Sequence, residues 1–356
     1  MRILHIAPFN TAGVPYTFVQ AEIDLGHESR LITLGRNRQE REEDICLELP
    51  FLDSWVVRSI KRFVTPSQRR EIRHIARIPE KIPLIWKPNG WIERSLFKFR
   101  ETIWKSKVDR AIREFGLKEF DVYQLDGGLG FYRDGRVMQG LQKCGKKIIC
   151  CYTGSDLRTR GVIPSIDALS DLNVTVEFDH LQYHPNIHHI PFPLGIFHFE
   201  MNNASDEGPV RIGHAPTSRA AKGSDIIIPI VRALENVYPA KLVLIEGMSY
   251  QNAIELKRSC HIFIDQIGDL GYGINSLESL AMAIPTCSSL APGFHEAYPE
   301  HPFIEVSASS LKDQLIRLIE NADLRGRLGK KGQTWVQRVH DAKSVVNKVH
   351  HLAGLS

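Results

Sequence analysis

Long hydrophobic runs are absent from this sequence, and their absence limits the classes of protein to which it can belong. None of the apolar stretches approaches the roughly 18 residues that a membrane-spanning helix needs. The first residues, MRILHIAPF, lack the longer apolar region and the small-residue cleavage site of a signal peptide. We therefore expect a cytoplasmic protein.

Metal-binding and disulfide patterns are also missing. The six cysteines show no CxxC pair and no zinc-ligand spacing, and two of them lie in the apolar run KKIICCY. His180 and His184 have an HxxxH spacing, but Pro185 and the strand-like character of the segment oppose a helical metal pair. We expect reduced cysteines in the core and no metal site.

Length and pattern indicate two domains of α/β type. A chain of 356 residues exceeds the size at which one hydrophobic core usually keeps growing. Residues 2–9 predict a strand, which is followed by a loop, a helix ending at Gly26 and the strand SRLITL. A second such series starts at VRIGHAP, after the proline-bracketed PFPLG. We expect two Rossmann-like, doubly wound domains, each with a parallel sheet, facing a cleft.

Positive charge is concentrated in one segment. The net charge is only +4, yet residues 54–116 contain 16 Lys and Arg against 6 Asp and Glu, which leaves 4 − 10 = −6 for the rest. Such a segment with interleaved aromatic residues suits an anionic membrane face, and a solvated helix pair with core tryptophans is the alternative. No nucleic-acid-binding module is recognisable, so we expect no nucleic-acid partner. The segment holds four of the five tryptophans: Trp55, Trp86, Trp91 and Trp104.

The stretch HAPTSRAAKGSD, residues 214–225, predicts an anion site. Arg219 and Lys222 follow the strand VRIG and precede a helix for which Ser224 or Asp225 would be the N-cap. The start of a helix favours an anion, and both cations bind phosphate oxygens. We infer a diphosphate site in which His214 contacts the nucleotide; a solvated basic loop is the alternative.

A glycine-rich stretch, residues 264–285, has a similar character. Gly271 and Gly273 allow the backbone to approach a ligand closely, and a helix follows them. Glu278, in the first turn of that helix, could accept hydrogen bonds from the vicinal hydroxyls of a ribose. Alternatively, Asn275 and Glu278 form a capping box, which needs no ligand.

Together these stretches resemble the retaining nucleotide-sugar glycosyltransferases of the GT-B fold, specifically family 4. The resemblance rests on five motifs, which are a glycine-bearing loop at 9–13, GSDxR at 154–158, PxP at 191–193, RxxKG at 219–223 and the glycine-rich LGYGINSLESLAMAIP. Leu270 stands where the family usually has a first glutamate that contacts the donor sugar. The closing ADLRGRLGKKGQTWVQRVH is similar to the family's terminal helices.

The resemblance implies three segments. Residues 1–195 would form an acceptor-side domain with the basic insertion at about 54–116, and residues 196–335 a nucleotide-sugar-binding domain. Residues 336–356 would form a helix that crosses back to the first domain.

The implied activity is hexosyl transfer from a nucleoside diphosphate sugar to a glycan or lipid-linked acceptor, with retention of configuration, in polysaccharide biosynthesis. The enzyme would be cytoplasmic, with peripheral association at the inner membrane face as a variant. A nucleotide-sugar epimerase and a non-catalytic nucleotide-sugar-binding relative are the alternatives.

The resemblance also assigns roles to residues. Arg219 and Lys222 would stabilise the departing diphosphate in place of a divalent ion, so no cofactor or obligatory metal is expected. Asp126 and Asp156 would orient acceptor hydroxyls or stabilise an oxocarbenium ion; either could instead cap a helix. The residues expected to bind substrate are Gly13, Gly154, Ser155, Arg158, His214, Gly271, Tyr272, Gly273, Ile274 and Glu278.

Overall fold

The chain divides into two compact units. The computed structural model describes residues 1–36, 42–52, 83–88, 90–154, 156–196, 199–205, 207–268 and 271–355. Unit 1 comprises Met1–Pro191 and Val345–Ser356, and unit 2 comprises Phe192–Ser344. The boundaries at 195 and 335 expected from the sequence stay predictions. No helix in the described ranges is both long and apolar enough to cross a membrane.

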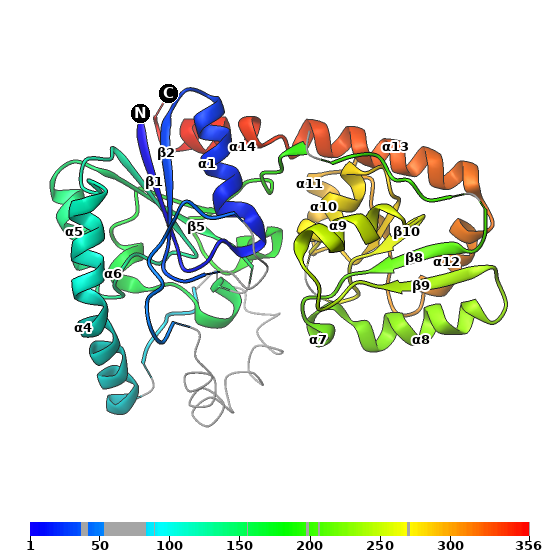
Figure 1. Cartoon of the computed structure of the whole chain (residues 1–356), viewed down its shortest axis with the longest axis horizontal. Coiled ribbons are helices and arrows are strands. Elements are labelled where there is room, and N and C mark those ends of the chain that lie inside the picture. Colours follow the sequence, from blue (N-terminus) through cyan, green and yellow to red (C-terminus); the bar gives the residue numbers. More distant parts are fainter. Residues whose placement is uncertain are drawn as a thin grey trace. The chain divides into compact units, whose positions relative to one another are not determined.

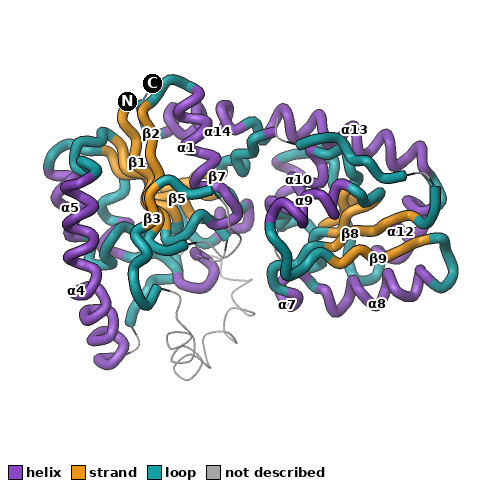
Figure 2. The backbone as a smooth tube through the Cα atoms, viewed as in Figure 1, coloured by secondary structure: helices purple, strands orange, loops and turns teal. Residues whose placement is uncertain are grey.

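The strands of the unit 1 sheet, drawn in Figures 1 and 2, pair in parallel throughout the described residues. Its strand order is β3-β2-β1-β4-β5-β6-β7 within the described residues, so the direction of winding reverses between β1 and β4. Open α/β sheets bind their ligands at the carboxyl ends of strands beside such a reversal. The strands are β1 (Arg2–Ala7), β2 (Glu28–Thr33), β3 (Ile45–Cys46), β4 (Val122–Asp126), β5 (Lys147–Tyr152), β6 (Leu172–Thr175) and β7 (His188–His189).

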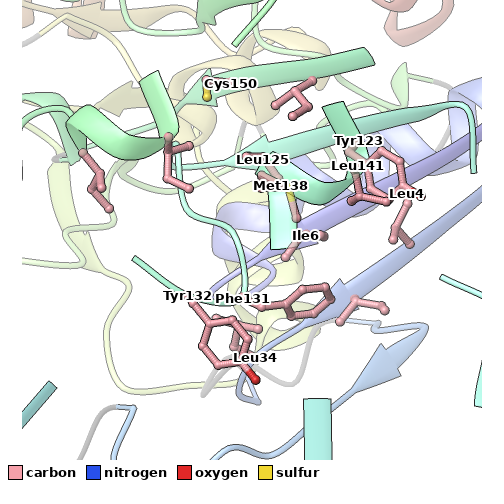
Figure 3. Packing of buried hydrophobic residues seen from close by; sticks show 14 of the residues in the cluster. Leu4, Ile6, Leu34, Tyr123, Leu125, Phe131, Tyr132, Met138, Leu141 and Cys150 are labelled. Carbon is pink, nitrogen blue, oxygen red and sulfur yellow. The ribbon is translucent and has the colours of Figure 1, made fainter. Parts of the chain in front are cut away.

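Helices cover both faces of this sheet because side chains alternate along its strands. Leu4 and Ile6 of β1 belong to a core cluster that includes residues of α4 and α5, and Figure 3 shows part of it. The next residue, Ala7, packs with Val19 of α1 instead. The helices are α1 (Val14–Asp24), α4 (Gly90–Glu114), α5 (Arg136–Lys143), α6 (Pro164–Asp167) and α14 (Ala342–Leu352), whose residues from Val345 onward belong to unit 1.

Unit 2 has a second parallel sheet with the order β12-β11-β10-β8-β9 in its described residues. Its strands are β8 (Val210–His214), β9 (Ala240–Leu244), β10 (Ile262–Ile264), β11 (Thr286–Ser288) and β12 (Ile304–Glu305). Its helices are α7 (Arg219–Lys222), α8 (Ser224–Glu235), α9 (Tyr250–Arg258), α10 (Ile274–Ala281), α11 (Phe294–Ala297), α12 (Leu311–Ile319) and α13 (Ala322–Val339). The predicted α/β fold with two parallel sheets is confirmed.

Two glycines allow α13 to pack closely against α10. A Cβ atom on Gly329 would lie 1.9 Å from the carbonyl oxygen of Ala283, and one on Gly332 would lie 2.5 Å from a methyl carbon of Leu280. The carbonyl oxygen of Ala283 belongs to the backbone, so it cannot move away by a change of rotamer.

We therefore expect Gly329→Ala to destabilise unit 2 by about 2 kcal/mol, because the clash outweighs the better helix propensity of alanine. Gly326→Ala is the matched control on the same helix, since a Cβ there meets nothing within 4 Å. It should raise stability by up to about 1 kcal/mol. Urea unfolding measures both, and equal stability of the two variants would contradict the packing argument.

Candidate functional site

The loop after β8 carries the two predicted cations. Arg219 and Lys222 are the first and last residues of the short helix α7, and α8 begins directly after it at Ser224. The N-cap of α8 is Gly223 in the left-handed region, with φ 67°, and no side chain caps the helix. The predicted caps Ser224 and Asp225 are therefore wrong. A Cβ at Gly223 would lie 2.2 Å from the carbonyl oxygen of Ile267, so this turn requires glycine.

Arg219 is paired with a carboxylate from the next strand. Its Nε and Nη2 donate to the two oxygens of Glu246 at 2.9 and 2.6 Å, and its side chain is 55% exposed. Glu246 follows β9, which is the edge neighbour of β8. The hydrogen bond from Arg219 lowers the pKa of Glu246.

Lys222 is paired with a carboxylate from the strand on the other side of β8. Its Nζ donates to Oδ1 of Asp265 at 2.7 Å, and Asp265 follows β10. The other oxygen of Asp265 accepts from the hydroxyl of Ser276 at 2.7 Å and from the backbone N–H of Gly273 at 3.0 Å. Burial opposes ionisation of Asp265, but Lys222 and these donors outweigh it and lower its pKa.

These pairs bring three strand ends together. Arg219 and Lys222 follow β8, Glu246 follows β9 and Asp265 follows β10, and the sheet order reverses at β8 and β10. The spacing of the two cations predicts one site for both, but no short motif links Glu246 or Asp265 to them. The rule that ligands bind at carboxyl ends of adjacent strands could have identified both carboxylates.

The glycine loop is anchored by its aromatic residue. Tyr272 is 5% exposed and stacks on Phe303 with ring centroids 4.7 Å apart. Its hydroxyl lies 3.4 Å from Nε2 of His340. The side chain of Tyr272 therefore points into unit 2. Its neighbours Gly271, Gly273 and Ile274 are half-buried. The departure at Leu270 lies outside the described residues.

His214 and Glu278 are both buried. Nδ1 of His214 lies 2.9 Å from the carbonyl oxygen of Ile264, and its Nε2 lies 2.8 Å from the hydroxyl of Ser224. Burial lowers the pKa of His214, which keeps the ring neutral. Both ring nitrogens thus contact protein atoms, and a contact with nucleotide stays a prediction.

Glu278 forms a buried ion pair with Lys257 of α9. A capping box was the alternative for Glu278, but α10 starts after Gly273, and Asn275 lies inside the helix. Asn275 instead accepts a hydrogen bond from Lys257 at 2.9 Å. The capping box is therefore excluded, while ribose binding by Glu278 stays a prediction.

Unit 1 contains a buried cluster of charged groups near the carboxyl end of its sheet. His5 of β1 lies between two carboxylates: its Nε2 is 2.9 Å from Glu22 of α1, and its Nδ1 is 3.5 Å from Asp126 at the end of β4. All three are at most 2% exposed. Burial alone would lower the pKa of His5, but the two carboxylates raise it to about 10. Burial raises the pKa of Asp126, and His5 opposes that shift.

Glu22 also contacts the C-terminal helix. It accepts a hydrogen bond from Ser29 at 2.6 Å, and Nε2 of His350 in α14 lies 3.6 Å from it. Burial would raise the pKa of Glu22, but His5, His350 and Ser29 lower it to about 2. This cluster was not predicted from the sequence, because no short motif joins residues of β1, α1, β4 and α14.

Asp156 is half-buried and lies beside this cluster. Its Oδ2 accepts from the backbone N–H of Thr153 at 3.0 Å, and a Cβ on Gly127 would lie 3.1 Å from the same oxygen. Burial raises the pKa of Asp156, and Arg160 partly offsets the effect. Asp126 and Asp156 therefore lie close together at the ends of β4 and β5, as loops after adjacent strands should.

The remaining predicted residues of unit 1 have structural contacts. Gly13 is the N-cap of α1 with φ 77°. Arg158 donates to Asp179, Glu177 and the carbonyl oxygen of Gly154, and Ser155 lies outside the described residues. Their roles in binding stay predictions.

The histidines of the HxxxH spacing have separate partners. Nδ1 of His180 lies 2.7 Å from the hydroxyl of Thr175, and Nε2 of His184 lies 3.2 Å from Asp167. In the described part of the chain, no group of three or more His, Cys, Asp or Glu could hold a metal ion.

Solved structures share this architecture over nearly the whole chain. No protein-family model matches the sequence, and no curated protein matches it either. Sucrose-phosphate synthase from Thermosynechococcus elongatus has a TM-score of 0.64 at 13% identity, covering 99% of this chain and 98% of its own. TarM has a TM-score of 0.60 at 9% identity, covering 99% of both chains.

HepE of Anabaena, in complex with UDP, has a TM-score of 0.59 at 10% identity, covering 99% of this chain and 100% of its own. A second HepE structure contains UDP-glucose. At such identities the likeness establishes the fold, and the chain has the GT-B fold.

Proposed function

We propose that the chain is a glycosyltransferase that moves a sugar from a nucleoside diphosphate sugar to a glycan or lipid-linked acceptor, with retention of configuration. The observation that supports it best is the cation pair at the carboxyl edge of the unit 2 sheet. Arg219 and Lys222 come from one loop, and each is oriented by a carboxylate from a neighbouring strand. HepE, which shares the fold, binds UDP and UDP-glucose.

The donor atoms of these cations suit a departing diphosphate. Glu246 uses Nε and Nη2 of Arg219, so Nη1 can donate to a phosphate oxygen. Lys222 has three N–H donors and directs one of them to Asp265. Negative charge that develops on the leaving oxygen is stabilised most by donors already in place, which need no reorganisation during the reaction.

Unit 1 supplies the acceptor groups in this proposal. Asp156 is the more accessible of the two carboxylates, so it would contact an acceptor hydroxyl, while Asp126 lies beneath it. In same-face transfer the departing phosphate oxygen takes the acceptor proton, and no carboxylate nucleophile is required.

A thermal-shift screen tests the proposal. UDP, GDP, ADP and their sugars are each added to the full chain, and one of them should raise the melting temperature, since a ligand at 100 times its Kd stabilises by about 2.7 kcal/mol. Incubation of that donor with candidate glycans, followed by NMR of the new linkage, then tests transfer and retention. A released 2-epimer without any acceptor would identify the epimerase alternative instead.

We expect transfer to continue in the presence of EDTA. Arg219 and Lys222 provide positive charge at the diphosphate, which is the task of a divalent ion in other enzymes. Initial rates with excess EDTA should match the untreated rate. Loss of activity that added Mg²⁺ restores would refute metal independence.

The exposed face of helix α4 supports a peripheral membrane contact. The tryptophans of the basic segment divide between the two alternatives, a membrane-facing surface and the core. Trp104 is 2% exposed and Trp86 packs against the same core, whereas Trp91 is 75% exposed; Trp55 lies outside the described residues. The exposed face of α4 carries an apolar stripe at helical spacing that continues into two cations. The stripe is Ile92, Leu96, Phe99 and Ile103, followed by Lys107 and Arg110.

We expect the protein to sediment with vesicles that contain anionic lipid, and Phe99→Ser with Ile103→Ser to reduce binding at least about tenfold, because each buried apolar side chain contributes about 1.5 to 3 kcal/mol. Ile23→Ser, an exposed apolar residue of α1, is the control. Equal binding to neutral and anionic vesicles at low salt would contradict the electrostatic part of the proposal.

A further inference from the structure

Lys257 is a fully buried lysine with no role in the proposed reaction so far. It lies near the end of α9, and its side chain is 1% exposed. Its Nζ donates to the carboxylate of Glu278 and, at 2.9 Å, to Oδ1 of Asn275. It also lies 5.1 Å from the ring centroid of Phe263. Lysine is almost never buried without such partners, because removing an ammonium from water is costly.

The partners of Lys257 link α10 to the cation loop. Asn275 lies in the first turn of α10, and its Nδ2 donates to the carbonyl oxygen of Ala215 at 3.0 Å. Ala215 directly follows β8, in the loop that leads to Arg219 and Lys222. One lysine therefore fixes Glu278 and, through Asn275, the start of the loop that carries both cations.

Stability alone is a weak explanation for this arrangement. Replacing a buried ion pair by apolar residues of similar volume is often neutral or stabilising. Through Asn275 the pair reaches Ala215, which follows β8 at the carboxyl edge where this fold places its ligand, while Lys257 itself packs over Phe263 of an apolar cluster of unit 2. Its position favours a part in binding.

We propose that Lys257 is a positioning residue, which holds the carboxylate of Glu278 in the orientation that accepts hydrogen bonds from the ribose hydroxyls of a nucleoside diphosphate. The inference rests on the proposed function. Without Lys257, the buried carboxylate would lose its cationic partner and would turn toward water or take up a proton. Recognition of the ribose, and not of the diphosphate, would be lost.

The test measures how well the protein distinguishes ribose from 2′-deoxyribose. Calorimetric Kd values are measured for whichever of UDP, GDP and ADP binds, and for its 2′-deoxy counterpart. We expect the wild type to prefer the ribonucleotide by about tenfold or more, since a hydrogen bond to a charged group is worth about 1.5 to 3 kcal/mol. Lys257→Met should bring this ratio close to one.

Arg211→Met is the matched control. Arg211 also anchors the end of α9, through Ser259 at 2.9 Å, and among the described residues its side-chain contacts do not include Glu278 or Asn275. It should lower the melting temperature and leave the ratio unchanged, which separates positioning from general support of α9. If Lys257→Met does not fold, Lys257→Gln is measured in its place, because its amide can still donate one hydrogen bond, and an intermediate ratio is expected.

The outcomes are distinct. A wild-type ratio near one, or a ratio that either Lys257 variant leaves unchanged, overturns the positioning role while nucleotide binding stands. If no nucleoside diphosphate binds the wild type, the proposed function fails, and this inference fails with it.

Discussion

Replacing Lys222 with methionine is expected to lower turnover about 100-fold to 1,000-fold, the effect of removing one preorganised donor at a developing oxyanion. Arg219→Met should have an effect of similar size, and the double variant a larger one. Lys222 is the more rigidly held of the two cations, because its side chain is only 16% exposed and its partner Asp265 is buried. Release of the nucleoside diphosphate from the donor found in the thermal-shift screen measures turnover.

A second substitution distinguishes a loss of turnover that is caused by lower stability from one that is caused by the missing Lys222 cation. Lys222→Met leaves Asp265 with two donors, Ser276 and Gly273, but without its cation. Adding Asp265→Asn removes the unpaired charge and should restore the melting temperature while turnover stays low. Arg232→Met serves as the surface control, since Arg232 is 62% exposed and, among the described residues, its ion pair is with Glu235 of the same helix. Normal turnover in Lys222→Met and Arg219→Met would eliminate the proposed role of these cations.

The second large effect is expected in unit 1, where Glu22→Leu should destabilise the fold by about 3 to 5 kcal/mol. Breaking a buried pair leaves its partner as an uncompensated charge, and His5 would keep only the longer contact to Asp126. Glu300→Leu is the control: it also breaks an ion pair, but Glu300 and Arg338 are 70% and 61% exposed. Such a pair contributes about 0 to 1 kcal/mol. Urea unfolding at pH 6 compares the two variants.

The contribution of Glu22 should also depend on pH. The pKa of His5 is raised to about 10 in the folded protein from an ordinary 6.5, so the folded state keeps a proton that the unfolded chain releases above pH 6.5. The pKa of Glu22 is lowered to about 2 from 4.5, so its contribution is complete above pH 4.5 and is lost as pH falls through 2.

The groups that face this pair are Asp126, His350 and Ser29, and they belong to other elements of unit 1. The advantage of the wild type over Glu22→Gln should therefore be largest between pH 4.5 and 6.5 and shrink as pH rises toward 10. Unfolding at a series of pH values checks this, and an advantage that stays constant or grows above pH 7 would show that His5 is not held protonated.

The sequence predicted the fold well because hydrophobic periodicity is a local signal. The strand expected at 2–9 is β1, Arg2–Ala7, and the strand expected from VRIGHAP is β8. Hydrophobic periodicity was a poorer guide to the residue at which a helix starts. Ser224 looked like an N-cap, yet the chain turns at Gly223, which alone tolerates the approach of the Ile267 carbonyl oxygen, a contact between residues distant in sequence.

Within the site, residue types were easier to predict than partners. Arg219 and Lys222 were found from their spacing, but Asp265 lies 43 residues beyond Lys222 and Lys257 lies 21 residues before Glu278. The strand order brings Lys222 and Asp265 together, and the packing of α9 against α10 brings Lys257 to Glu278. The family resemblance of its loop predicts that Tyr272 binds substrate, but its burial among Phe303, Phe294 and His340 depends on residues that follow later in the chain.

Unit 1 is assembled from two separate stretches of the chain, since Val345–Ser356 packs with Met1–Pro191. The ribosome synthesises Val345–Ser356 only after it has synthesised all of unit 2, Phe192–Ser344. During synthesis the second half can therefore complete its core first, while the first half waits for His350 to reach Glu22. Early translation products would then be the form most dependent on protection from aggregation.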